Sequence, residues 1–203
     1  MPGDNNAFLT VSRVVSVLGH PLLTAAGFVV FVSFTRFGSA TALASSAVVI
    51  GLVILPIAAW NYRNTQKGRY SNFDVSVRSQ RHSFYRVSVG LLLLATGVLW
   101  LTDQPPSLRY GMGFALLLVV ISGLANLYVK ASLHTSVSVF LSLALLTIHP
   151  VAGAVLLGFS AVVAGSRWVL GRHTLPEIAA GAAIGLAVGG GLYFFMEHAA
   201  PWV

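Results

Sequence analysis

The sequence predicts an all-α integral membrane protein, a polytopic bundle of about seven transmembrane helices (six to seven). Of its 203 residues, 56% are hydrophobic and only 8% are charged, and its mean hydropathy is +0.83. A soluble domain of this size cannot enclose so much apolar surface, so lipid must solvate a large part of it. The apolar residues also gather into runs close to the roughly 20 residues that a helix needs to cross a bilayer.

Seven apolar runs follow one another along the chain. They cover residues 14–35, 41–60, 84–101, 110–129, 135–148, 150–169 and 175–195. The first run is longer than the roughly 7–15-residue core of a secretion signal, so we expect it to be retained as a helix. The fifth run is short, and only His149 and Pro150 divide it from the sixth. It either spans the membrane or forms a tight hairpin with the sixth. Small residues at every fourth position of the last run, a spacing typical of close helix packing, are Gly181, Gly185 and Gly189.

The polar segments between these runs are short, which predicts a single membrane domain over residues 1–203. Residues 1–13 form a short N-terminal tail, and 61–83 form a polar basic loop. The polar stretch 61–86 carries six basic residues and one acid, Asp74. It is either a basic loop that touches anionic lipid head groups or, given its length, a functional segment.

Alternate threading of seven helices puts most of the positive charge on one side of the membrane. The N-terminus and the segments 61–83, 130–134 and 167–174 lie on that side. With Arg86, near the start of the next apolar run, the side holds ten of the twelve Lys and Arg residues. Cytoplasmic loops of membrane proteins are enriched in Lys and Arg. We therefore expect this side to face the cytoplasm, in the inner or plasma membrane of a prokaryote.

Histidines and arginines gather on the same basic side. His82, His134 and His173 lie there with Arg81 and Arg167. Arginines bind phosphate oxygens through a planar fork of donors, whereas a positive region with few carboxylates disfavours a metal cation. The residue types indicate an anionic substrate, and we expect no metal and no other cofactor. The absence of cysteine excludes disulfides and thiolate metal sites.

Two histidines suit phosphoryl transfer. A neutral imidazole can attack phosphorus and form a covalent intermediate, and a second can protonate the leaving oxygen, because its ordinary pKa of about 6.5 suits proton transfer near neutrality. The attacking histidine needs an orienting carboxylate, and Glu177 is the nearest one to His173 in the sequence. Glu177 also completes the pattern TxxE with Thr174, with Pro176 between them, which is typical of a helix N-terminus. The orienting and capping roles compete for one carboxylate, and both stay open.

The stretch SRWVLGRHTLPE, which begins at Ser166, resembles SRxxxxxHxxxD, the third signature of the type 2 phosphatidic acid phosphatase family, with Glu177 in place of Asp. The match continues through the following IAAGAAIG. The resemblance implies that His173 is the nucleophile and that Ser166 and Arg167 hold phosphate. It also implies that Glu177 orients His173.

The second signature of that family, PSGH, resembles ASLH, which ends at His134. The resemblance implies that His134 is the general acid. It also implies that Ser132 and the preceding Lys130 contribute to phosphate binding.

The first family signature, KxxxxxxRP, departs most from this chain. Arg81 matches its Arg, but His82 replaces the Pro and Asp74 stands at the Lys position. Another basic residue of the loop supplies the missing charge, or the phosphate site has lost one of its clamps. The resemblance spans roughly residues 60–195, with an extra helix pair between the first two signatures.

The resemblance implies an integral-membrane phosphatase that hydrolyses a lipid phosphate or an isoprenoid (pyro)phosphate through a phosphohistidine. Its partners are that lipid and the bilayer, and no nucleic acid is expected. The mechanism requires His134 and His173 to face one pocket with Arg167. Two alternatives stay open: a catalytically impaired relative that acts as a membrane lipid-binding or scaffold protein, and a carrier of anions or lipid phosphates.

Overall fold

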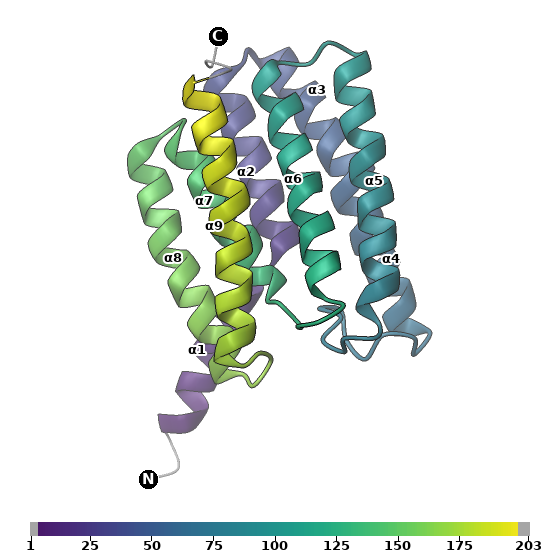
Figure 1. The fold of residues 1–203 in the computed structure, drawn as a ribbon, viewed down its shortest axis with the longest axis vertical. Helices are drawn as coiled ribbons and strands as arrows, with labels where there is room; N and C mark the ends of the chain where they lie inside the picture. The colour runs from purple at the N-terminus through teal and green to yellow at the C-terminus, as the bar shows by residue number, and fades with distance from the viewer. Residues whose placement is uncertain (1–3, 199–203) are drawn as a thin grey trace.

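The computed structural model describes residues 4–198, and over that range it contains helices and no strands (Figure 1). The elements are α1 (Asp4–Leu18), α2 (Pro21–Arg36), α3 (Ser39–Val49), the π-helical segment η1 (Ile50–Ile54), α4 (Leu55–Gln66), α5 (Arg81–Leu101), α6 (Pro106–Ala125), α7 (Leu133–Leu146), α8 (Pro150–Val169) and α9 (Leu175–His198). The predicted all-α membrane bundle is confirmed at this level.

Five helical stretches between residues 4 and 198 are long and apolar enough to cross a membrane. They are Ser39–Gln66, which joins α3, η1 and α4, together with α5, α6, α8 and α9. The α1–α2 pair adds a sixth if it counts as one broken span. The helix α7 has only 14 residues, a length of about 21 Å against a hydrocarbon core of about 30 Å. Five or six helical stretches of the described residues could therefore cross a membrane, which meets the predicted range of six to seven at its lower end.

The first apolar run is not one straight helix. The chain bends by 51° between α1 and α2. Pro21 begins α2, and His20 caps it by accepting the Leu22 N–H at Nδ1. Gly19 contacts α8 so closely that a Cβ there would overlap Val163. The region predicted as a tail, 1–13, is helical from Asp4 onward.

The short helix α7 lies at the centre of the bundle and packs against α8 and α9 (Figure 1). Ten of its residues are buried, which explains why its sequence is apolar although it is too short to span. The glycines of α9 allow the close approach. A Cβ at Gly185 would lie 2.6 Å from the Ser136 carbonyl oxygen, and one at Gly189 would lie 2.9 Å from Leu143 Cδ1. The predicted packing role of these glycines is confirmed.

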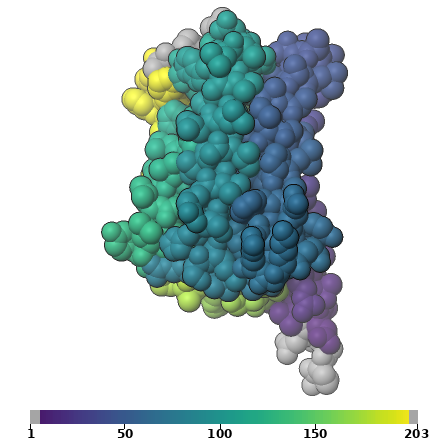
Figure 2. Space-filling model, turned by 90° about the vertical axis from the view of Figure 1, so that its right-hand side faces the viewer, coloured from purple at the N-terminus to yellow at the C-terminus, as the bar shows by residue number. Residues whose placement is uncertain are grey.

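Three polar connections meet at the lower end of the bundle in Figure 1: 67–80, 126–132 and 170–174. The basic loop is shorter than predicted, because α4 continues to Gln66 and α5 begins at Arg81. In Figure 2 its blue atoms cover the lower end of the visible face, next to yellow-green atoms near residue 170. Arg78 holds the loop in place by donating from Nε to the Asn126 carbonyl oxygen at 2.8 Å.

Candidate active site

Six ionisable side chains from distant parts of the described chain come together at this lower end. They are His20 at the α1–α2 corner, Asp74 in the 67–80 loop, Arg81 at the start of α5, His134 at the start of α7, Arg167 in the last turn of α8 and His173 in the 170–174 loop. The last four are each at most 5% exposed. Buried charges are costly unless they are paired, so the contacts among these groups define the site.

His173 and Glu177 form an imidazole–carboxylate pair. His173 Nδ1 lies 2.9 Å from Glu177 Oε2, and the same oxygen accepts the Thr174 backbone N–H at 3.2 Å. Gly171, at a φ of +62°, lets the chain turn between α8 and α9 and brings His173 to the start of α9. The expected competition between orienting His173 and capping α9 is therefore wrong, because one carboxylate oxygen does both.

The carboxylate determines which nitrogen of His173 is free. Because Glu177 accepts a hydrogen bond, Nδ1 of the neutral imidazole carries the proton and Nε2 keeps its lone pair. Arg81 Nη2 lies 3.4 Å from that Nε2. Two backbone carbonyl groups fix the position of the Arg81 guanidinium. Its Nε donates to the Val75 carbonyl oxygen at 3.0 Å, and its Nη1 donates to the Ala131 carbonyl oxygen at 2.8 Å. The His173–Glu177 pair therefore places the unprotonated Nε2 of His173 beside the fixed guanidinium of Arg81.

His173 is neutral near pH 7. Burial lowers its pKa, the positive charge of Arg81 adds to this effect, and the Glu177 hydrogen bond opposes it, which leaves the pKa at about 4. The same side chain in an unfolded chain has a pKa of about 6.5. Between pH 6.5 and pH 4 the unfolded chain therefore binds more protons at this residue than the folded chain does. Stability falls as the pH falls through that window.

We expect this loss to depend on His173. The melting temperature of the wild type should fall between about pH 6.5 and pH 4 by more than that of His173→Gln, which has no proton to bind. Above about pH 6.5 the difference between the two proteins should not change with pH. Thermal unfolding of both proteins over this range measures the effect. Parallel curves across the whole range would contradict a lowered His173 pKa.

Arg167 is paired with Asp74. Its Nη1 donates to Asp74 Oδ2 at 2.9 Å and to Ser16 Oγ at 2.5 Å. Asp74 Oδ1 lies 3.4 Å from His20 Nε2, and Oδ2 lies 4.0 Å from His134 Nε2. Burial alone would raise the pKa of Asp74, but the His20 hydrogen bond and the interactions with His134 and Arg167 outweigh burial and hold that pKa well below its usual range. Asp74 is therefore an ionised carboxylate surrounded by donors.

The donor atoms of His20, Asp74 and His134 lie within 4.8 Å of one another, close enough to hold one metal ion. The hydrogen bonds argue against that use. The Leu22 N–H donates to His20 Nδ1 at 3.2 Å, so the proton of neutral His20 is on Nε2, the nitrogen that faces Asp74. A metal ion would also lie next to the Arg167 guanidinium. The three residues fit a hydrogen-bonded carboxylate better than a cation site.

His134 and His173 line different spaces. His134 lines a small cavity of about 40 Å³ with Asp74 and Arg81, and its Nε2 has no hydrogen-bond partner among the described residues. His173 lines an open hollow instead. Arg81 connects the two spaces, because it lines the cavity and its guanidinium contacts His173. The requirement that both histidines face one pocket with Arg167 is not met in this conformation.

Two predicted phosphate ligands bond to their own helices. Ser132 is the N-cap of α7, and its Oγ accepts the Thr135 N–H at 3.4 Å. Ser166 Oγ donates to the Val163 carbonyl oxygen at 2.6 Å. Both hydroxyls are buried, and a phosphate role for them stays a prediction.

Lys130, by contrast, lies beside His173. Its Nζ donates to the Arg172 carbonyl oxygen at 2.9 Å and is 3.7 Å from Glu177 Oε2. Lys130 also lines the same open hollow as His173. Its ammonium group is therefore available to an anion that enters the hollow.

Comparison with known protein families, curated proteins and solved structures gives no match. The chemistry of the site therefore follows from its residues alone. It offers a neutral imidazole with a free Nε2, together with the cationic groups of Arg81, Arg167 and Lys130 at the same end of the bundle. Such a set can bind an anion and present it to the imidazole.

An apolar groove adjoins the site between α2 and the stretch formed by η1 and α4. Its walls include Leu23, Ala26 and Ile54, and it also takes in His20 and Asp74. A molecule with an apolar tail and a polar head can therefore contact hydrocarbon-like walls and the ionisable cluster at the same time.

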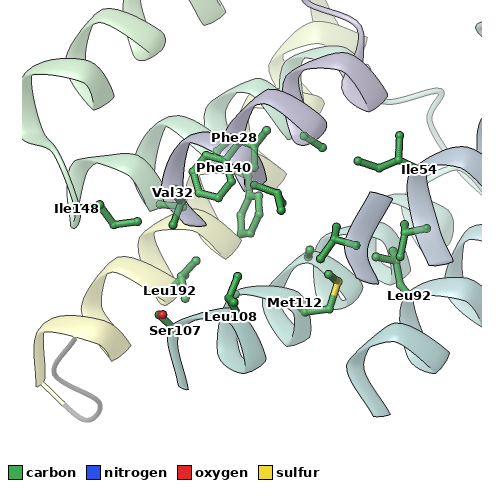
Figure 3. A pocket seen from close by; sticks show the side chains of 18 residues that line it. Phe28, Val32, Ile54, Leu92, Ser107, Leu108, Met112, Phe140, Ile148 and Leu192 are labelled. Atoms are coloured by element: carbon green, nitrogen blue, oxygen red, sulfur yellow. The ribbon is translucent and has the colours of Figure 1, made fainter. Parts of the chain in front are cut away.

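A second apolar space lies between α2, α5, α6 and α7, with a volume of about 130 Å³ (Figure 3). Phe28, Met112 and Phe140 line it, and Ser107 contributes a hydroxyl. Ile54 borders both this cavity and the groove. The cavity suits hydrocarbon, and none of its lining residues is ionisable.

Proposed function

We propose that the protein is an integral-membrane phosphatase that hydrolyses a lipid phosphate or an isoprenoid phosphate through a phosphohistidine. The observation that carries the proposal is the His173–Glu177 pair with Nε2 facing Arg81. Arg81, Arg167 and Lys130 bind the phosphate, with the N-terminal amides of α9 adding to anion binding.

In a conformation that opens the His134 cavity to the hollow beside His173, His173 Nε2 attacks phosphorus as the bond to the lipid oxygen breaks. His134, which enters this step as an imidazolium, gives that oxygen a proton. Water then attacks the phosphohistidine, His134 takes a proton from it, and phosphate leaves with His173 restored. The lipid tail lies in the groove between α2 and α4 while its phosphate meets the basic end of the bundle. By the distribution of positive charge, that end faces the cytoplasm.

A second candidate is a lipid-binding or scaffold protein without catalysis. It is favoured by the separate spaces of His134 and His173 and by the Asp74 carboxylate that holds Arg167. The two candidates share the groove and the basic end, and they differ only in turnover.

Incubation of the purified protein with phosphatidic acid, an isoprenyl monophosphate and an isoprenyl diphosphate separates the candidates. Release of inorganic phosphate from any of them supports the phosphatase. Binding of these lipids without release from any of them rejects the phosphatase and supports the second candidate.

Two substitutions at Glu177 separate orientation from capping. In Glu177→Gln an amide oxygen still accepts the Thr174 N–H, so we expect stability within about 0.5 kcal/mol of the wild type. Phosphate release should fall by about 10²- to 10⁴-fold, because an amide supports the wrong imidazole tautomer. Glu177→Ala also removes the cap, at a cost of about 1 kcal/mol. Denaturant unfolding and initial rates measure the two effects, and wild-type rates in Glu177→Gln would refute the orienting role.

A further inference from the structure

Asp74 already gives Arg167 the kind of partner that a phosphate oxygen provides. Arg167 Nη1 donates to Asp74 Oδ2 at 2.9 Å, and Arg167 is 2% exposed. A guanidinium binds carboxylate and phosphate oxygens with the same planar set of donors. A phosphate can therefore occupy this face of Arg167 only after Asp74 releases it.

Buried polar groups close to the Asp74 carboxylate have no hydrogen-bond partner. Within residues 4–198, Arg167 Nε and His134 Nε2 are buried and make no hydrogen bond. His134 Nε2 lies 4.0 Å from Asp74, beyond hydrogen-bond distance. The two Asp74 oxygens are engaged by Arg167 and His20. A phosphate group has more oxygens than a carboxylate. The additional oxygens can accept hydrogen bonds from groups that Asp74 does not reach, such as Arg167 Nε.

Asp74 also separates two spaces. The small cavity beside His134 and the groove between α2 and α4 share part of their lining. The residues that line both are His20, Leu22, Phe73 and Asp74. The cavity measures about 40 Å³, against about 520 Å³ for the groove. Because Asp74 lines both spaces, a movement of its side chain would join the cavity to the groove.

The charge of the site suits a phosphate monoester. The cations Arg81, Arg167, Lys130 and Arg172, the last of which lines the hollow with Lys130, exceed the anions Asp74 and Glu177 by two positive charges when the histidines are neutral. A phosphate monoester carries a charge of about −1.5 to −2 near neutral pH. A diphosphate brings additional negative charge close to the Asp74 carboxylate, and the like charges repel each other.

We propose that Asp74 is a specificity-determining residue that occupies Arg167 until a lipid phosphate displaces it, and that its charge favours a monophosphate over a diphosphate. The inference rests on the proposed function for the identity of the lipid, while binding of an anion needs no turnover. Asp74 thereby acts both as a competitor for Arg167 and as part of the wall between cavity and groove.

Calorimetric titration of the purified full-length protein with inorganic phosphate and with pyrophosphate tests the inference. We expect phosphate to bind Asp74→Asn roughly tenfold more tightly than the wild type. This factor corresponds to a wild-type protein in which Asp74 leaves Arg167 free about one-tenth of the time. The gain for pyrophosphate should be larger. Asp103→Asn is the matched control, because it removes the same charge from a side chain that is 93% exposed at the other end of the bundle, and it should bind like the wild type.

Equal phosphate affinity in the wild type and in Asp74→Asn would overturn the inference, and an equal gain for both anions would overturn its selectivity. The substitution Asp74→Asn leaves Arg167 without its carboxylate, which lowers the stability of the protein. The fold of this variant is therefore checked by thermal unfolding. At matched ionic strength, phosphate should raise its melting temperature more than chloride does. The double variant Asp74→Asn/Arg167→Gln should lose the gain in affinity, and a retained gain would place the effect elsewhere and overturn the inference.

The outcomes also separate this inference from the proposed function. Tighter phosphate binding in Asp74→Asn, together with no hydrolysis of any lipid phosphate by either protein, rejects the phosphatase and supports Asp74 as the displaced anion. Hydrolysis by the wild type with unchanged anion affinity in Asp74→Asn supports the phosphatase and rejects the role of Asp74.

Discussion

Replacing His173 with alanine is expected to reduce the rate of phosphate release from the lipid substrate by at least about 10⁴-fold. The proposed mechanism forms a covalent bond to His173 Nε2, and removal of a covalent nucleophile costs more than the loss of any single binding contact. His173 lies in the loop between α8 and α9, outside both helices, and Glu177 still accepts the Thr174 N–H in the variant. The variant should therefore keep its fold, and initial rates of phosphate release measure the effect.

His82→Ala is the control for this experiment. His82 belongs to the same basic side and is the second residue of α5, but it is exposed, so we expect its variant to keep the wild-type rate. Wild-type turnover in His173→Ala would show that another group attacks phosphorus. Loss of turnover in both variants would point to a general disturbance of the basic end.

Replacing Arg167 with glutamine is expected to lower the free energy of unfolding by about 3 kcal/mol, because removal of one partner strands the other charge in a poorly solvated site. Arg167 is 2% exposed and binds both Asp74 and Ser16. The double variant Asp74→Asn/Arg167→Gln has neither charge, and it should regain at least half of the loss. Denaturant unfolding of the wild type, Asp74→Asn, Arg167→Gln and the double variant forms a double-mutant cycle that isolates the interaction between the two side chains.

Arg172→Gln serves as the matched control. Arg172 lies in the same connection between α8 and α9 and is exposed, so its loss should change stability by no more than about 0.5 kcal/mol. A double variant no more stable than Arg167→Gln would contradict the view that the cost comes from a stranded Asp74 charge.

The sequence predicts the helices well but not which of them cross the membrane. An apolar run looks the same whether lipid or protein surrounds it. The residues of α7 are apolar because α8 and α9 enclose them, as the buried positions of that helix show. The bend at Gly19 depends on the contact with Val163 in α8, so only His20 and Pro21 offered a local signal.

In the site, too, contacts between residues close in sequence can be predicted, whereas contacts between distant segments cannot. His173 and Glu177 lie one helical turn apart, so their hydrogen bond can be predicted from spacing. The pairing of Asp74 with Arg167 joins loops from distant parts of the chain, and no spacing rule predicts it. A lone acid in a basic loop was the available signal, and it indicated an unusual residue without indicating its partner.

The most direct test of the central claim is to trap the phosphorylated protein. Rapid mixing with a lipid phosphate that the protein hydrolyses, followed by an alkaline quench and peptide mass spectrometry, measures the site of phosphorylation. The account predicts a phosphoryl group on His173 that is stable in alkali, lost in acid and absent from His173→Ala. Turnover with a phosphoryl group on any other residue, or with none on the protein at any time during the first turnover, would contradict it.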